Sequence, residues 1–229
     1  LKESEVQQAL MSWQEEENSK LKILKDYVEI GKGTPFEDFE FPAEDYAEFQ
    51  RRREILGGPI RRILYRLRLL KNVGGEDFRQ ESGFVDLQEA IQVIASKSQR
   101  TDIFVREELQ TREDAWSILI DASHSLNIFK GEVRGIALSL AEVARMQILD
   151  QNSWGMYAFN NKFYVIKDFS ERFDVHVKAR IGGLSHGGFT YLPDAVLLAA
   201  QALTKRSEEA RVLVVVSDFF PAGYENAEE

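Results

Sequence analysis

A short apolar run that ends in an acid, followed by two hydroxyls at alternate positions, places the strongest limit on the fold of this chain. Ala115 to Ile120 is mostly apolar, is preceded by charged residues and has the length of a buried strand. Asp121, Ser123 and Ser125 follow it, and a helical pattern begins a few residues later. These side chains should therefore lie at the carboxyl end of a strand, where open α/β sheets bind ligands. Their oxygens suit a hard cation such as Mg²⁺.

Two later segments carry further oxygen ligands at comparable places. Gly187-Gly188-Phe189 leads through Thr190 into a helical pattern, and Asp218 ends a second apolar run, Val212 to Ser217. The pattern D-x-S-x-S alone is a weak signal, because short motifs recur by chance. Together, the three segments resemble the metal-ion-dependent adhesion site (MIDAS) of von Willebrand factor A (VWA) domains.

The resemblance implies a site for Mg²⁺, or for Mn²⁺ or Ca²⁺, formed by Asp121, Ser123, Ser125, Thr190 and Asp218. The serine hydroxyls would bind the ion directly, and the two aspartates would act mainly through water and orient the shell. With so little direct negative charge the ion stays electrophilic, and a carboxylate from a partner could complete its coordination. In the alternative, Asp121 and Ser125 only cap the following helix, which explains neither Thr190 nor Asp218.

The resemblance also implies a fold. Residues 114–229 would form a VWA domain, a Rossmann-like, doubly wound α/β unit with a mostly parallel sheet and an antiparallel hairpin at its edge. Residues 1–113 would form a mainly helical extension. A VWA sheet normally carries two more strand–helix repeats than this sequence offers before Glu229, so the resemblance implies that the last elements are missing.

Apolar periodicity and helix breakers predict the individual elements. The predicted strands cover residues 115–121, 153–159, 162–167 and 211–217, and the predicted helices cover 3–30, 43–56, 59–72, 86–98, 130–149, 171–184 and 191–204. Gly57-Gly58 should end one helix and Pro59 begin the next. Asn160-Asn161 suits a tight hairpin turn. Residues 35–42 should form a short aromatic linker.

The extension contains a basic amphipathic segment, Ile60 to Leu70, whose arginines surround an apolar stripe. Such a helix can bind nucleic acid, anionic lipid or an acidic partner, or it can present a solvated face over buried apolar groups. With the D-L-x-x-A-I pattern from Asp86 to Ile91 and the segment from Val177 to Val196, it resembles the VWA proteins of the cobaltochelatase CobT and nitric-oxide-reductase activation (NorD) group. That resemblance implies an AAA+ ATPase of the MoxR or chelatase kind and a client protein as partners. The candidate partner-binding residues are Arg61, Arg62, Arg66, His124 and Phe219.

The composition excludes several classes of function. The net charge of −9 argues against nucleic-acid binding, and no apolar run approaches the length of about 20 residues that a membrane helix needs. The absence of cysteine rules out disulfides, thiolate metal sites and a cysteine nucleophile. With no visible signal peptide, these features predict a cytoplasmic protein.

The motifs favour binding over catalysis. Gly183 to Gly187 matches G-x-S-x-G by letter, but a nucleophile elbow needs a strand before the serine and a helix directly after it. No Walker A pattern is present. We therefore expect a non-catalytic, Mg²⁺-dependent adaptor that acts with an AAA+ ATPase. The alternatives are a chelatase-type subunit that contacts a tetrapyrrole and a Mg²⁺-dependent phosphohydrolase.

Overall fold

The structure, a computed structural model, describes residues 3–71, 76–80, 84–85, 96, 104–107, 114–148 and 150–220. The chain forms two compact units: Leu1–Ile60 joins Glu113–Glu229 in the first, and Arg61–Arg112 forms the second. The prediction was a single boundary near residue 113. The observed division differs because the first helix contacts the strand over residues 39–40 and the helix over 192–204, and the start of the second helix lies against the helices over 130–147 and 175–182.

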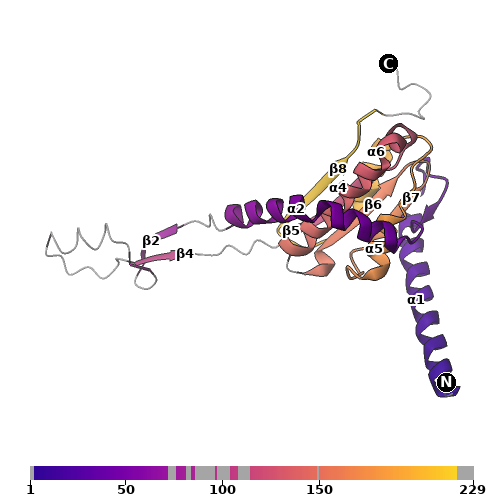
Figure 1. The fold of residues 1–229 in the computed structure, drawn as a ribbon, viewed down its shortest axis with the longest axis horizontal. Helices are drawn as coiled ribbons and strands as arrows, with labels where there is room; N and C mark the ends of the chain where they lie inside the picture. The colour runs from indigo at the N-terminus through magenta and orange to yellow at the C-terminus, as the bar shows by residue number, and fades with distance from the viewer. Residues whose placement is uncertain are drawn as a thin grey trace. The chain divides into compact units, whose positions relative to one another are not determined.

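A five-stranded sheet with the order β1-β7-β6-β5-β8 forms the centre of the first unit (Figure 1). Its strands are β1 (Phe39–Glu40), β5 (Asp114–Asp121), β6 (Trp154–Phe159), β7 (Phe163–Lys167) and β8 (Ala210–Val216). The strand β5 is parallel to β6 and β8, β1 is parallel to β7, and β6 and β7 are antiparallel. The α/β class with a mostly parallel sheet and one antiparallel hairpin is thus confirmed.

The hairpin does not form the edge of the sheet, which corrects the prediction. The strand β1 lies outside β7, in the segment predicted to be a linker. The reason is aromatic packing: the rings of Phe36 and Phe39 lie 5.6 and 5.9 Å from the ring of Phe163. These contacts hold a two-residue strand that periodicity cannot detect.

The helices of the first unit cover the sheet. Besides the start of the second helix, they are α1 (Glu3–Ile30), α4 (Lys130–Gln147), α5 (Val175–Gly182) and α6 (Leu192–Thr204), with short 3₁₀ segments η1 (His124–Phe129) and η2 (Gln151–Ser153). Helices α1 and α6 share one core with the aromatic side of the sheet, including Tyr27, Leu119, Phe163 and Leu198. On β5 the alternate residues Ile118 and Ile120 are also fully buried, and α4 contacts both β5 and α5. Both faces of the strand are therefore covered.

Helix α2 (Tyr46–Lys71) is continuous, so the predicted break at Gly57-Gly58-Pro59 is wrong. An interior proline costs a helix about 3 kcal/mol. Ile60 and Leu64, one turn apart, are both buried, and burial of two such side chains is worth roughly 3–6 kcal/mol. Burial of these two side chains therefore outweighs the cost of Pro59 inside the helix.

The second unit contains a small antiparallel sheet with the order β2-β4-β3, formed by β2 (Glu76–Gln80), β3 (Phe84–Val85) and β4 (Phe104–Glu107). This sheet was not predicted. The predicted helix over residues 86–98 lies outside the described residues. Within the part of the chain that the structure describes, no helix is both long enough and apolar enough to cross a membrane.

Candidate functional site

The candidate metal-binding residues lie at the carboxyl edge of the sheet, where β5 and β8 end side by side. The two strands are parallel, and their register pairs Ile120 with Val216. Asp121 is the last residue of β5, and Ser217 and Asp218 follow β8 directly. Parallel pairing therefore brings the loop after β5 and the loop after β8 to the same edge.

Asp121 is fully buried and joins these two loops. Its Oδ1 accepts a hydrogen bond of 2.8 Å from the backbone N–H of Ser123, and its Oδ2 accepts one of 2.6 Å from the hydroxyl of Ser217. The Oγ of Ser217 in turn accepts a bond of 2.9 Å from the N–H of Phe219. Ser217 was not among the predicted ligands. Its position between an apolar strand and a candidate acidic ligand was the available signal.

Ser123 and Ser125 bring their hydroxyls together. Their Oγ atoms are 3.0 Å apart, and Ser123 is buried whereas Ser125 is exposed. Two oxygens that bind Mg²⁺ at about 2.1 Å and at right angles are about 3.0 Å from each other. This separation is that of a hydrogen bond between the two hydroxyls, and it also fits adjacent ligand positions of an octahedral ion.

The loop that carries Thr190 runs beside the loop after β5. The N–H of Gly187 donates to the carbonyl of Ala122 at 2.9 Å, and the N–H of His124 donates to the carbonyl of Gly188 at 3.1 Å. Thr190 is 2% exposed. Among the described hydrogen bonds, none joins the hydroxyl of Thr190 to Asp121 or to the two serines. The loop therefore lies beside the site, but no described hydrogen bond fixes the threonine oxygen there.

Asn161, in the β6–β7 turn, holds the same loop from its other side. Its Oδ1 accepts from the N–H of Phe189, and its Nδ2 donates to Glu37 at 3.2 Å. Gly188 has φ = +75°, and a Cβ there would collide with the side chain of Asn161. Glycine is therefore required for this close approach. Asn161 was predicted only as a residue of the turn.

Asp218 is exposed, and its Oδ1 accepts a bond of 3.1 Å from the N–H of Phe220. Phe219, between them, has φ = 58°. This left-handed conformation is rare for a bulky residue and stores strain. Strained backbone conformations are concentrated at functional sites, and this one lies next to Asp218, a candidate metal ligand.

His186 is not a cationic group at neutral pH. Burial, followed by the positive charges of Arg134 and Lys130, lowers its pKa to about 4. Helix α5 ends at Gly182, so a helix rather than a strand precedes the G-x-S-x-G match at residues 183–187. The match therefore lacks the backbone of a nucleophile elbow.

The candidate partner-binding residues do not form one group. His124 and Phe219 are exposed at the candidate metal site. Arg61, Arg62 and Arg66 are exposed on α2 but belong to the second compact unit. The structure therefore does not join these arginines to the site.

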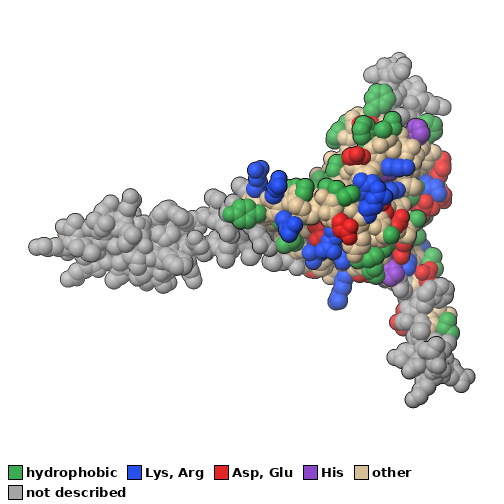
Figure 2. All heavy atoms as spheres, viewed as in Figure 1, with side chains coloured by type: hydrophobic (Ala, Val, Ile, Leu, Met, Phe, Trp, Pro, Cys, Tyr) green, Lys and Arg blue, Asp and Glu red, His purple; other side chains and the backbone are tan. Residues whose placement is uncertain are grey.

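Large apolar side chains are exposed on each of the three loops. They are Ile128 and Phe129 after the two serines, Phe189 beside Thr190, and Phe219 and Phe220 after Asp218, and each is more than half exposed. We call these five residues the apolar rim. Figure 2 shows hydrophobic side chains at the end of the molecule where β8 leads toward the C-terminus. Only Phe219 among them was predicted to bind a partner, because loop residues carry no periodic signal.

Among the described residues, no group of three or more His, Asp or Glu side chains could hold a metal ion. A metal at this edge would depend on hydroxyls and on single carboxylates. The chain matched no family model, no curated protein and no solved structure.

Proposed function

We propose that the chain binds Mg²⁺ through the three loops and uses the ion to bind a protein partner. The observation that carries this proposal is the 3.0 Å separation of the Ser123 and Ser125 hydroxyls beside the buried Asp121 carboxylate. Thr190 and Asp218 supply further oxygens. Mn²⁺ and Ca²⁺ are the other hard cations to be tested at the same site.

The role proposed for Asp121 is to orient the shell. Both of its carboxylate oxygens already accept hydrogen bonds from the protein, so it suits a water-mediated contact better than a direct one. The directly bound groups are then mainly neutral hydroxyls. An ion held in this way keeps a high affinity for an incoming carboxylate.

The apolar rim supports a protein as the partner. Exposed apolar residues that surround a polar centre are typical of protein–protein contacts, in which apolar groups exclude water from a central polar contact. We infer that the partner is an AAA+ ATPase of the MoxR or chelatase kind, acting on a client protein in the cytoplasm. That part of the proposal rests on the resemblance to the CobT/NorD group.

Titration calorimetry with Mg²⁺ and Mn²⁺ tests the metal site on the wild type, Asp121→Ala and Ser123→Ala. Ser207→Ala, an exposed serine before β8, is the control. We expect binding to weaken at least tenfold in both site variants and to stay unchanged in the control. Equal binding by the wild type and Asp121→Ala would reject the site.

A pull-down from native extract with and without EDTA tests the partner. The ATPase should be recovered only when divalent ions are present, and Ser123→Ala should lose it while the fold, followed by circular dichroism, survives. Recovery of the same ATPase in equal amounts under both conditions would show that the metal site is not where it docks.

A further inference from the structure

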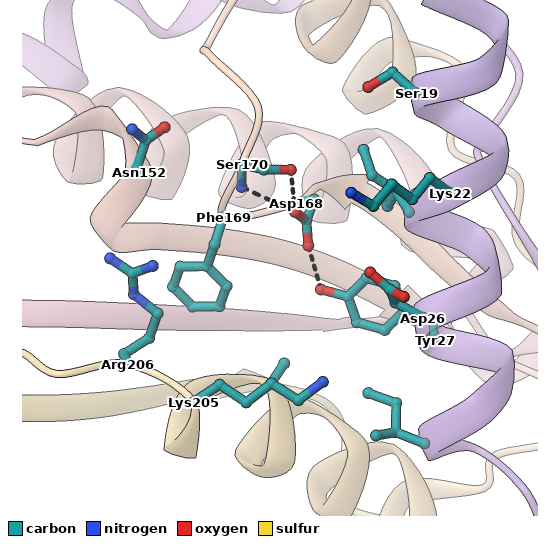
Figure 3. A pocket seen from close by; sticks show the side chains of 13 residues that line it. Ser19, Lys22, Asp26, Tyr27, Asn152, Asp168, Phe169, Ser170, Lys205 and Arg206 are labelled. Carbon is teal, nitrogen blue, oxygen red and sulfur yellow. Dashed lines mark hydrogen bonds between the residues drawn. The ribbon is translucent and has the colours of Figure 1, made fainter.

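A cavity of about 570 Å³ lies between α1 and the sheet, away from the candidate metal site. Its walls come from α1, from the loop after β7, from η2 and from the end of α6, and Figure 3 shows the side chains that face it. Asn152 precedes β6, and Lys205 and Arg206 precede β8. The cavity therefore opens at the amino edge of the parallel strands, opposite the edge that carries Asp121.

Two of the charged groups that line the cavity, Asp168 and Arg206, are already engaged by the protein. The carboxylate of Asp168 accepts hydrogen bonds from the hydroxyl of Tyr27 and from both the N–H and the hydroxyl of Ser170. Arg206 pairs with Glu208 at 2.6 Å. These groups shape the cavity but have little capacity left for a ligand.

Two lysines have that capacity. Lys22 on α1 and Lys205 at the end of α6 both line the cavity, and neither forms an ion pair with a described residue. In Figure 3 they extend from two walls into the same space. Their ammonium groups can therefore receive an anionic group of a ligand, next to the carboxylates of Asp26 and Asp168 in the same lining.

The cavity is much larger than a simple anion and contains other polar groups. Its volume lies in the range of about 300–1,000 Å³ that is typical of small-molecule sites. The side chains of Ser19 and Asn152 can donate hydrogen bonds, and Asp26 faces the same space with a carboxylate that accepts them. A carboxylate beside two ammonium groups disfavours a bare anion and favours a ligand that also carries a hydroxyl or amino donor.

We propose that this cavity binds a small phosphate monoester, with the phosphate between Lys22 and Lys205 and a hydroxyl or amino group of its organic part donating to Asp26. The site is independent of the candidate metal site. Because α1 forms one wall and α6 and the β7 loop form the others, a bound ligand bridges elements that lie far apart in the sequence.

Calorimetry on the full chain in EDTA tests this proposal with inorganic phosphate and a panel of esters: AMP, glucose 6-phosphate and glycerol 3-phosphate. Adenosine and glucose are the phosphate-free controls. At least one ester should bind more than tenfold tighter than inorganic phosphate and than its phosphate-free control. Lys22→Ala and Lys205→Ala should each weaken that binding at least fivefold, and Lys25→Ala, on the same helix but outside the cavity lining, should not.

The outcomes separate this proposal from the one on the metal site. Ser123→Ala should keep full ester binding, so the failure of one site leaves the other standing. The proposal is overturned if no ester binds tighter than inorganic phosphate, or if Lys22→Ala and Lys205→Ala bind like Lys25→Ala. Folding of each variant is checked by its unfolding midpoint, and Lys22→Gln and Lys205→Gln repeat the test if an alanine variant is unstable.

Discussion

The hydroxyl of Tyr27 donates a hydrogen bond of 2.6 Å to Oδ1 of Asp168, across 141 residues of sequence. The same hydroxyl lies 2.7 Å from that of the fully buried Tyr157. Burial raises the pKa of both tyrosines well above the ordinary value of 10.0, so both phenols stay protonated. This chain of hydrogen bonds fixes the C-terminal half of α1 to the sheet.

Replacement of Tyr27 by Phe should therefore destabilise the first unit while preserving ring packing. The change removes the hydroxyl that bonds Oδ1 of Asp168 and the hydroxyl of Tyr157, and such a loss costs about 1–3 kcal/mol of unfolding free energy. Urea unfolding at pH 7 measures it. Tyr46→Phe, which removes an exposed hydroxyl bonded to Gln50, should change stability by less than about 0.5 kcal/mol. Equal midpoints for the two variants would contradict the structural role of Tyr27.

Lys167 should make stability depend on pH above neutrality. Its side chain is fully buried, and its Nζ donates to the carbonyls of Gln151, Trp154 and Asp168 at 2.7–3.1 Å. Burial lowers its pKa from 10.5 to about 8, although nearby carboxylates of Glu171 and Asp168 oppose the shift. Between about pH 8 and 10.5 the unfolded chain then binds more protons than the folded one, so the unfolding free energy rises with pH.

Comparison with Lys167→Met isolates this contribution, because other titrating groups are common to both proteins. Relative to that of the variant, the unfolding free energy of the wild type should rise by up to about 3 kcal/mol between pH 8 and 10.5. Below pH 7 the difference in unfolding free energy between the two proteins should be constant. Urea unfolding at several pH values measures it. A difference between the two proteins that does not change above pH 8 would contradict the lowered pKa.

Gly188→Ala should lower the unfolding free energy, and Gly187→Ala should leave it nearly unchanged. A side chain at Gly188 would adopt a left-handed conformation and collide with Asn161, whereas no atom lies within 4 Å of a Cβ placed at Gly187. We expect a loss of about 1–3 kcal/mol for the first variant. The second should change stability by less than about 1 kcal/mol. Thermal unfolding of both, measured side by side, checks the prediction, and similar midpoints would show that the loop adapts.

Ser217→Ala should weaken metal binding more than it weakens the fold. The change removes the hydroxyl that bonds Asp121 and accepts from the N–H of Phe219. Loss of a group that orients a ligand lowers metal affinity about 10–100-fold. Calorimetry with Mn²⁺ measures the effect, and Ser217→Thr, which keeps a hydroxyl, should restore most of it. If alanine and threonine bind equally, the hydroxyl has no orienting role.

The sequence predicted elements whose signal is local. Strand β5, the β6–β7 hairpin and helices α1, α4 and α6 follow from apolar periodicity and turn residues within single segments. The continuous α2 and the short β1 were not predicted, because burial of Ile60 and Leu64 and the contacts of Phe36 and Phe39 with Phe163 are tertiary.

The same distinction applies to the sites. Asp121, Ser123 and Ser125 could be selected because one loop carries them all. The bond between Ser217 and Asp121 and the convergence of Lys22 with Lys205 depend on segments that meet only after folding. The spacing of residues within the sequence predicts neither arrangement.

The pairing of β1 with β7 has a consequence for synthesis of the chain on the ribosome. Phe39 pairs with Phe163, so the aromatic side chains of Phe36 and Phe39 emerge long before their partner strand exists. At about 5–20 residues per second, that interval is on the order of 6–25 s. During this time the early aromatic segment has no native surface to cover it and stays exposed on the nascent chain.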